Sequence, residues 1–376
     1  MSIIIANRLL KQLNKIGIPS QFGHIGCQEA LHSLRRSLLL CRQHGLPSYV
    51  LFVDLVKAFD MIQHELLYQI LARYGLPNEL INVIEKMYKD CKVKISIGKE
   101  DREIEYGTGV QQGNNMAPIL FLFVMQAVME TLDLTGTTKP EFRYFPQSDK
   151  PLKQCGRLLG QPTKSNGSSF NIENLLYVDD GAFLFQSHGD IQTGAQKIHD
   201  HFARFGLQMH VGNASTKSKT EAMFFPTTLQ EAESSITCPG DLILNNGTNK
   251  IHFSKKFRYL GATITPEINE NAEVEIRIKK ASSQMGILRH FFNGKDIDHR
   301  VKYWVYLVGP LNCLLWGCES WNLTERNKEK LRAFHHSAIR RILDITWTRV
   351  REEKITNEEI RHRFCQIPEI DTFIIR

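Results

Sequence analysis

The sequence lacks the segments that would place a protein in a membrane or export it from the cell. Its longest apolar stretch, residues 305–316, is too short to span a bilayer comfortably and is interrupted by Gly309, Pro310 and Asn312. Residues 1–8 have neither the basic leader nor the apolar core of a signal peptide. These absences predict an intracellular protein, nuclear or cytoplasmic and not secreted, with no membrane partner.

Cysteine occurs without the spacing that a disulfide framework or a metal site requires. None of the eight cysteines forms a Cys-x-x-Cys pair, and scattered cysteines in a chain of 376 residues are typical of reduced thiols. The grouping closest to a zinc set is Cys313, Cys318, His335 and His336. Because its spacing is poor and its setting apolar, we expect buried thiols there in preference to zinc.

Charge of one sign is only mildly in excess. Lys and Arg total 47 against 40 Asp and Glu, a formal net charge of +7. This balance fits a nucleic-acid partner without requiring one. Hydrophobic residues at 42% and charged residues at 23% are typical of a globular protein, and the length allows two or three subdomains with their own cores.

The most informative feature that is present is a pair of adjacent aspartates, Asp179 and Asp180, between two apolar runs. The runs, residues 175–178 and 181–185, predict buried strands, and the Asp-Gly step predicts a hairpin with both carboxylates at its tip. Burying charge is costly unless it is paired, and a divalent metal ion is the natural partner for hard oxygen donors held together.

A third carboxylate, Asp54, ends another short apolar run at residues 49–54. Phosphoryl transfer assisted by two metal ions requires carboxylates that converge on one point from different strands. Asp54, Asp179 and Asp180 therefore predict such a site. The alternative is that these aspartates cap helices or face solvent.

The order of the remaining elements predicts an α+β fold. A strand, the hairpin, a helix capped by Asp190 and further strands at 208–211 and 222–225 indicate a sheet with helices on one face. Residues 135–167 are rich in Gly, Pro, Ser, Thr and Lys, which predicts a long insertion with little order. Helical patterns dominate after about residue 264, where we expect a domain boundary.

Six segments, in order, resemble motifs of the reverse transcriptases of non-LTR retrotransposons. They are residues 54–60, 109–118, 177–180, 205–207 with 219–220, 257–261 and 316–321. Each motif alone is weak, but six in the order of the family are hard to obtain by chance.

The resemblance implies the fold of a right-hand polymerase. Its palm would contain an antiparallel sheet with helices on one face, accompanied by partial fingers and a helical thumb. The implied boundaries are 1–48 and 61–108 for the fingers, 49–60 and 109–263 for the palm with the insertion at about 135–167, and 264–376 for the thumb and C-terminal region.

The implied activity is that of an RNA-directed DNA polymerase, with an RNA template, a DNA primer and dNTP as partners and two Mg²⁺ ions as cofactors. Asp54, Asp179 and Asp180 would be catalytic and would bind the metal ions, with the main-chain carbonyl of Leu55 as a further ligand. The sequence does not indicate an oligomeric state.

The resemblance also implies nucleotide-binding residues. Phe59 would stack beneath the incoming sugar and exclude a 2′-hydroxyl, although a core phenylalanine would fit the same position. Gln112 and Gly113 would contact nucleotide and template, a role compatible with a turn before the following helix. Lys219 would place its charge near the triphosphate or donate a proton to pyrophosphate; a solvated lysine is the alternative.

A last group of residues is expected to contact the nucleic acid. It consists of Tyr177, Tyr259, Leu260, Gly261, Arg277 and Lys280. The basic members lie on a helix predicted at 274–288, where Lys and Arg could follow a phosphate backbone. A solvated helix face is equally compatible with that pattern.

The resemblance is incomplete near the beginning of the chain. Relatives carry basic fingers residues upstream of Leu9, and residues 21–26 resemble a motif that usually has an arginine where His24 or Ile25 stands. We therefore expect an N-terminally truncated copy, with a catalytically inactive nucleic-acid-binding remnant as the alternative. A metal-dependent nuclease is a third possibility, in which Phe59 and the Gln112-Gly113 loop would have no role.

Overall fold

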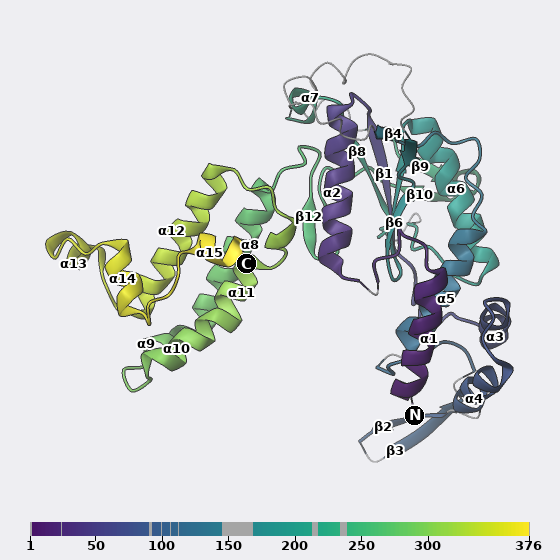
Figure 1. Cartoon of the computed structure of the whole chain (residues 1–376), viewed down its shortest axis with the longest axis horizontal. Coiled ribbons are helices and arrows are strands. Elements are labelled where there is room, and N and C mark those ends of the chain that lie inside the picture. The colour runs from purple at the N-terminus through teal and green to yellow at the C-terminus, as the bar shows by residue number, and fades with distance from the viewer. Residues whose placement is uncertain are drawn as a thin grey trace. The chain divides into compact units, whose positions relative to one another are not determined.

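The computed structural model divides the chain into two compact units, Met1–Leu260 and Gly261–Arg376 (Figure 1). Each unit is described by itself. The residues that the structure describes are 2–23, 25–89, 92–98, 100–105, 107–111, 113–144, 168–212, 217–233 and 239–375.

A four-stranded antiparallel sheet forms the centre of the first unit. Its strands, in spatial order, are β6 (Asn174–Tyr177), β7 (Asp180–Phe185), β1 (Ser48–Val53) and β8 (Glu221–Phe225). After its first residue, Ser48, β1 is a continuous apolar run, and its side chains are buried on both faces apart from the half-buried Tyr49. The prediction of an α+β fold with an antiparallel sheet is confirmed.

Helices pack against one face of this sheet. Leu51 and Phe183 are paired in register and share that face, and Phe183 lies edge-to-face with Phe202 of α6 (His188–Arg204), their ring centroids 6.5 Å apart. On the opposite face Phe52 stacks on Phe257, with centroids 4.4 Å apart. The sheet is therefore held between two apolar layers.

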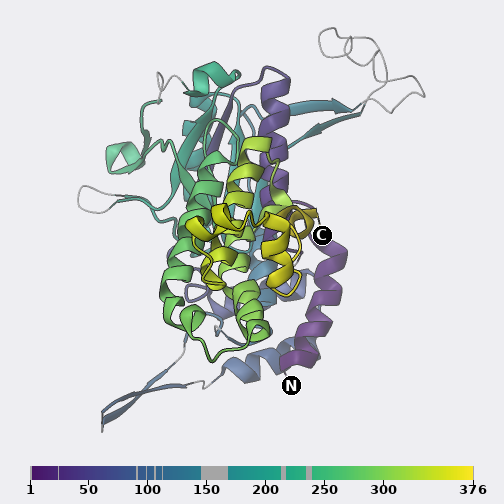
Figure 2. The ribbon, with the colours of Figure 1, turned by 90° about the vertical axis from the view of Figure 1, so that its left-hand side faces the viewer.

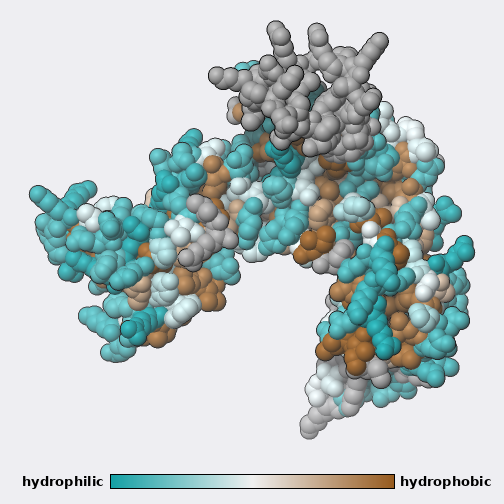
Figure 3. Space-filling view, viewed as in Figure 1, coloured by the Kyte–Doolittle hydropathy of each residue, from teal (hydrophilic) through white to brown (hydrophobic). Residues whose placement is uncertain are grey.

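The helix α5 (Ala117–Glu130) lies in the interior of the first unit. It is apolar on all sides and buried along most of its length, because it packs against α1 (Ser2–Ile16) and α3 (His64–Arg73). Figure 3 shows apolar surface at the beginning of α1, where Ile3 and Ile4 are exposed. The helix α5 therefore connects the core of the unit to the loop that precedes α5.

The first unit contains further elements, several of which contribute fully buried side chains, such as Leu34 and Leu244. They are α2 (Cys27–Gln43), α4 (Asn78–Tyr88), β2 (Lys92–Ile97), β3 (Glu100–Glu105), β4 (Glu141–Tyr144), β5 (Ser168–Asn171), α7 (Leu229–Glu233), β9 (Leu242–Leu244), β10 (Asn249–Ile251) and β11 (Phe257–Tyr259). The β2–β3 hairpin extends away from the helices of its unit (Figures 1 and 2). Within the expected insertion at 135–167, residues 141–144 pair with β5 as β4, and residues 145–167 lie outside the described residues.

The second unit is helical after the short strand β12 (Ala262–Ile264). Its helices are α8 (Asn271–Ile287), α9 (Arg289–Asn293), α10 (His299–Tyr306), the π-helical turn η3 (Leu307–Leu311), α11 (Asn312–Leu315), α12 (Glu325–Ile342), α13 (Trp347–Glu352), α14 (Asn357–Arg363) and α15 (Ile370–Ile375). Apolar side chains from α8, α10, α12 and α14, such as Val274, Tyr306, Ile339 and Ile360, form its core.

Two local predictions are wrong in detail. The N-cap of α6 is Ser187, whose hydroxyl accepts a hydrogen bond from the main-chain N–H of Asp190, so Asp190 lies inside the first turn. Residues 208–211 form an isolated antiparallel bridge between Met209 and Leu55 instead of a strand. Among the residues that the structure describes, no helix combines the length and apolarity needed to cross a bilayer.

Candidate active site

The strand register brings Asp54 and Asp180 together. Val53 of β1 pairs with Gly181 of β7, so the next residue pair in this antiparallel register is Asp54 with Asp180. Residues directly opposite each other in such a pair point to the same face, with Cβ atoms about 4.5–5.5 Å apart. Two carboxylates from different strands therefore converge at one end of the sheet.

Asp179 joins them from the turn between β6 and β7. Tyr177 pairs with Asp180, so the two turn residues are Val178 and Asp179. The expected hairpin is present, but the Asp180-Gly181 step lies in β7 and does not form the turn. Val178 has φ 57°, a left-handed conformation that costs on the order of 1–2 kcal/mol for a residue with a Cβ. A strained turn next to the carboxylates is typical of functional sites.

The three carboxylates perturb one another. Burial, the carboxylate of Asp179 and that of Asp54 together raise the pKa of Asp180 to about 7. Burial also raises the pKa of Asp179, and the charge of Asp54 contributes to the same shift. Desolvation and like charge both disfavour the ionised forms, so a cation at this position would relieve an existing electrostatic cost.

The donor set fits a divalent metal ion. Among the described residues, no three His, Cys, Asp or Glu side chains are already grouped closely enough to hold an ion. The chemistry is nevertheless suitable, because hard carboxylate oxygens are the ligands that Mg²⁺ prefers and the raised pKa of Asp180 marks a deficit of positive charge. Leu55, the other candidate ligand, is buried and forms a bridge with Met209.

The expected nucleotide-binding residues lie on segments near the carboxylates. Phe59 follows Asp54 in the chain and stacks on Phe121 of α5, with ring centroids 4.7 Å apart and ring planes at 16°. The main-chain N–H of Val110 donates to the carbonyl of Phe59 at 2.8 Å, which fixes the loop before α5 beside this ring. Gly113, in the same loop, is exposed with φ 90°. Gln112 lies outside the described residues.

Glycine is required where this loop crosses the turn after Asp54. Gly109 has φ 90°, and a Cβ atom there would lie 2.8 Å from the Cα of Asp60. Its main-chain N–H donates to the carbonyl of Ile62 at 2.7 Å. The close approach of the two main chains is therefore possible only without a side chain.

Lys219 lies in the segment that follows α6. Its side chain is exposed, and its main-chain N–H donates to Nδ1 of His210 at 3.2 Å. His210 in turn donates its own main-chain N–H to the carbonyl of Asp54 at 2.8 Å. These bonds connect the main chain of Lys219 to the Asp54 segment.

Two residues expected to contact nucleic acid are instead part of the interior. Tyr259 is buried against Phe52, and its hydroxyl donates to the carbonyl of Leu175 at 3.3 Å. Burial also raises its pKa. Arg277 is 5% exposed, pairs with Glu273 at 2.5 Å and donates to the carbonyl of Gly261 at 2.8 Å. Both side chains are occupied by structural contacts, so neither fits the expected role.

The other expected contact residues are less enclosed. Tyr177 is half-buried at the end of β6, and Lys280 is half-buried on α8. Leu260 and Gly261 both have left-handed main-chain conformations, with φ 46° and φ 81°. Nothing in their placement assigns them to a nucleic-acid surface.

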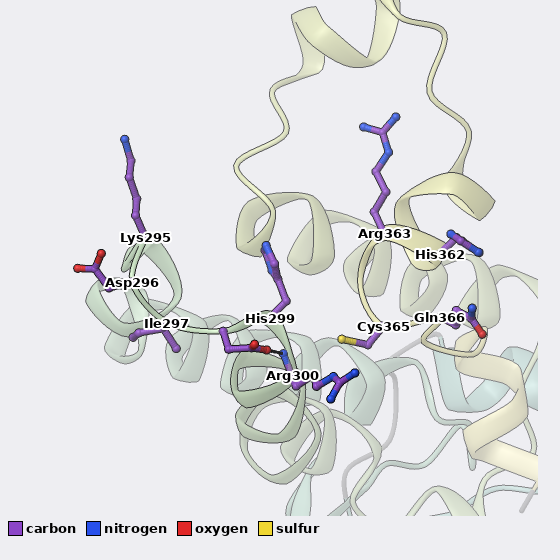
Figure 4. Close-up of a pocket in the computed structure, with 10 residues that line it drawn as sticks. Lys295, Asp296, Ile297, His299, Arg300, His362, Arg363, Cys365 and Gln366 are labelled. Carbon is purple, nitrogen blue, oxygen red and sulfur yellow. Dashed lines mark hydrogen bonds between the residues drawn. The ribbon is translucent and has the colours of Figure 1, made fainter.

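The second unit has a basic pocket that the motifs do not predict. Its volume is about 790 Å³, and it lies between the residues around the start of α10 and the end of α14. Figure 4 shows that its basic side chains come from both elements. They are Lys295, His299, Arg300, His362 and Arg363, all exposed. The two carboxylates in the lining are Asp296 and Asp298, and Asp298 caps α10. The unit therefore offers exposed cations at a place other than α8.

The surroundings of His335 and Cys318 show how two members of the possible zinc set are used. His335 is fully buried, and its ring nitrogens contact the hydroxyl of Tyr306 at 2.9 Å and the carbonyl of Pro368 at 3.2 Å. Burial raises the pKa of Cys318 to about 11, which favours the neutral thiol. The expectation of a buried thiol therefore holds for Cys318, whereas Cys313 is only half-buried.

The chain resembles known proteins over most of its length. The profile of the family described as reverse transcriptase (RNA-dependent DNA polymerase) matches residues 1–264 of the 376. The Pol polyprotein of the type-1 retrotransposable element R2 of Nasonia vitripennis is 28% identical over 162 residues, 43% of this chain and 13% of that protein. That of the type-2 element R2DM of Drosophila melanogaster is 29% identical over 136 residues, 35% of this chain and 13% of that protein.

The matches therefore span about one eighth of the length of these relatives. Among solved structures, apo telomerase from Candida tropicalis has a TM-score of 0.46 at 12% identity, covering 100% of this chain and 52% of that chain. The R2 relatives confirm the resemblance to non-LTR reverse transcriptases that the motifs predict. By the match over residues 1–264, the chain belongs to the reverse transcriptase (RNA-dependent DNA polymerase) family.

Proposed function

We propose that this chain carries the active site of an RNA-directed DNA polymerase from a non-LTR retrotransposon. The observation that supports it most directly is the convergence of Asp54, which follows β1, Asp179 of the β6–β7 turn and Asp180 at the start of β7. Their buried and mutually repelling charges are costly for a fold that does not use them.

Two Mg²⁺ ions are the proposed cofactors, held by Asp54, Asp179 and Asp180 with the main-chain carbonyl of Leu55. When bound, such ions lower the pKa of an attacking hydroxyl and stabilise charge on the transferred phosphoryl group. The protein supplies the ligands from the end of its central sheet and the adjoining turn, and binding of the ions would draw the three carboxylates closer together.

The reaction is nucleotide transfer to a primer. The 3′-hydroxyl of a DNA primer, paired with an RNA template, attacks the α-phosphate of a dNTP, and pyrophosphate leaves. Phe59 is proposed to exclude nucleotides with a 2′-hydroxyl, and the loop with Gln112 and Gly113 to line the nucleotide. Lys219 is proposed to act near the triphosphate, since its side chain is exposed on a segment connected to Asp54.

We propose that the fingers, palm and thumb follow the boundaries expected from the motifs. Residues 49–60 and 109–263 would form the palm around the four-stranded sheet, with fingers at 1–48 and 61–108. Residues 264–376 would form the thumb and C-terminal region. In this last region, the exposed cations of the basic pocket are better candidates for phosphate contacts than the buried Arg277.

The experiment measures incorporation of labelled dTTP on an oligo(dT)-primed poly(rA) template with Mg²⁺. Wild type is expected to incorporate dTTP, and Asp179→Asn to reduce the rate by at least about 10³-fold, because a ligand of the reaction centre is lost. The matched control is Asp200→Asn, an exposed carboxylate on α6 that should leave the rate unchanged.

Other outcomes decide between the alternatives. Synthesis that survives Asp179→Asn would exclude the proposed site. Binding of primer–template by wild type without synthesis would favour an inactive nucleic-acid-binding remnant. Degradation of DNA in the absence of dNTP would favour a metal-dependent nuclease.

A further inference from the structure

The main chain of Val178, in the turn that carries Asp179, is held by one buried glutamine. Gln21 is 6% exposed. Its Oε1 accepts hydrogen bonds from the main-chain N–H groups of Val178 at 2.9 Å and Gly23 at 2.8 Å. Its Nε2 donates to the carbonyl of Val178 at 3.3 Å. Both main-chain polar groups of Val178 are thus satisfied by a single side chain.

Gln21 is itself fixed at the edge of the sheet. The N–H of Leu176 donates to the carbonyl of Ser20, and the N–H of Phe22 donates to the carbonyl of Leu176, each at 2.8 Å. Residues 20–22 therefore run along β6 as a short parallel bridge. Because its neighbours on both sides are bonded to the strand, the side chain of Gln21 has a fixed origin from which to hold the turn.

Val178 needs the support of Gln21 because the turn adopts an unfavourable main-chain conformation. Val178 is β-branched and has φ 57°, and such residues keep a left-handed conformation only where the surroundings impose it. A different conformation at Val178 would redirect the next residue, Asp179. The amide of Gln21 is the group that contacts both ends of this strained residue.

A second buried side chain holds Asp54 in the same way. The hydroxyl of Thr220, which is fully buried, accepts from the main-chain N–H of Asp54 at 3.1 Å and donates to the carbonyl of Asp54 at 3.3 Å. The main-chain N–H of Thr220 donates to the carbonyl of His210 at 3.1 Å. The hydroxyl therefore secures the main chain of the carboxylate-bearing residue itself.

We propose that Gln21 and Thr220 are positioning residues for the nucleotidyl-transfer site, which set the main chain of Val178 and of Asp54 and thereby the relative placement of the carboxylates. This inference rests on the proposed function. Neither side chain is a metal ligand or touches the reacting groups. Each acts through the main chain that carries a carboxylate, in the manner of outer-shell groups that orient ligands.

Thr220 permits a test in which shape and hydrogen bonding are separated. Thr220→Val keeps the branched shape and removes the hydroxyl, whereas Thr220→Ser keeps the hydroxyl. Thr220→Val is expected to lower kcat for dTTP incorporation by about 10-fold or more and to raise the Mg²⁺ concentration needed for half-maximal rate, because outer-shell losses typically cost about 10- to 100-fold. Thr220→Ser should remain within about threefold of wild type, and the KM for dTTP should change little in either variant.

The test of Gln21 uses a second buried glutamine, Gln126, as its control. Gln21→Met fills a similar volume without polar groups. Gln126 is also buried, and it also bridges main-chain groups, those of Ile16 and Ile18, but not the turn. Gln21→Met should lower kcat about 10-fold and raise the Mg²⁺ requirement. Gln126→Met should lower the melting temperature without changing the Mg²⁺ requirement. If Gln21→Met does not fold, the Thr220 pair carries the test.

The outcomes separate this inference from the function on which it rests. Absence of synthesis by wild type, or synthesis by Asp179→Asn, would remove the proposed function and this inference with it. If wild type is active and Asp179→Asn is not, a folded Thr220→Val with unchanged kcat and Mg²⁺ requirement would overturn the positioning role alone. The positioning role would also be overturned if kcat fell in Gln21→Met and in Gln126→Met alike, in proportion to the loss of melting temperature in each variant.

Discussion

Asp54 directly follows β1 and Asp180 begins the neighbouring strand β7, and the register between Val53 and Gly181 brings these two like charges to the same end of the sheet. Their surroundings add to the cost, since burial is the largest cause of the raised pKa of Asp180. A sequence under selection for stability alone would replace one of them with a neutral residue. The pair is therefore best understood as a site whose charge is completed by a ligand.

Phe59 is the residue at which structure and function can be separated most directly. Its ring stacks on Phe121 in the core, yet it is only partly buried. If it excludes the 2′-hydroxyl, Phe59→Val should raise the ratio of ribonucleotide to deoxyribonucleotide incorporation by about 10- to 100-fold, because pocket contacts of this size are worth about 1–3 kcal/mol. The measurement is kcat/KM for UTP and dTTP on the same primer–template.

The control for Phe59 is Phe202→Leu, in a fully buried ring of α6 that packs on Phe183. This change should lower the melting temperature and leave the nucleotide ratio unaltered. An unchanged ratio in Phe59→Val, together with a lower melting temperature, would assign Phe59 to the core alone.

At the scale of elements, the strands could be predicted because their signal is local. β1 and β7 are short apolar runs next to carboxylates. The register of the two antiparallel strands then places these carboxylates at the same end of the sheet. The turn could not be placed, because the Asp180-Gly181 step is a good turn sequence and the actual turn at Val178 depends on Gln21, which is distant in the chain.

The burial of certain polar side chains could not be predicted from the sequence either. Tyr259 has no local feature that distinguishes it from an exposed residue, and its placement follows from the carbonyl of Leu175, which the fold supplies. Arg277 follows Glu273 by one helical turn, but such a pair is equally typical of an exposed helix face, and the further partner that the fold supplies is the carbonyl of Gly261. Gln21 lies in a segment with a family resemblance, but that resemblance assigns it no contact.

The helical second unit should be sensitive to mildly acidic pH. Burial lowers the pKa of His335 on α12 to about 4, and the nearby charges of His336 and Arg361 act in the same direction. In the unfolded chain this pKa is near 6.5. The unfolded state therefore binds more protons between these two values, so stability is complete above pH 6.5 and is lost as the pH falls towards 4.

From pH 7 to pH 5 we expect a loss of about 2 kcal/mol in the free energy of unfolding from this residue. The groups that hydrogen-bond to its ring are the hydroxyl of Tyr306 and the carbonyl of Pro368, neither of which ionises in this range. The ring of His336, whose pKa burial also lowers, lies with its centroid 5.9 Å away and adds to the pH dependence. Urea denaturation of the full chain, followed by helical circular dichroism, measures the loss. His335→Gln should reduce the pH dependence, whereas the exposed His362→Gln should preserve it. Equal pH dependence in wild type and His335→Gln would contradict this account.

At the scale of the whole molecule, a nucleic-acid partner requires phosphate contacts from exposed cations. The net charge of +7 is small, so the position of those cations matters more than their total. Three permanently charged residues line the basic pocket of the second unit, Lys295, Arg300 and Arg363 (Figure 4). Phosphate contacts release counterions, and each contact contributes about −0.9 to the slope of log affinity against log salt for a duplex.

Lys295→Gln together with Arg363→Gln should therefore weaken binding of an RNA–DNA primer–template and make the salt slope shallower by about 1–2, without changing the melting temperature. Asp296→Asn is the matched control of opposite sign, because it removes a negative charge from the same lining and should tighten binding. Fluorescence anisotropy across a salt series measures both effects. If the double variant has the slope of wild type, the pocket makes no phosphate contact, and the cations that bind the nucleic acid belong to other surfaces of the chain.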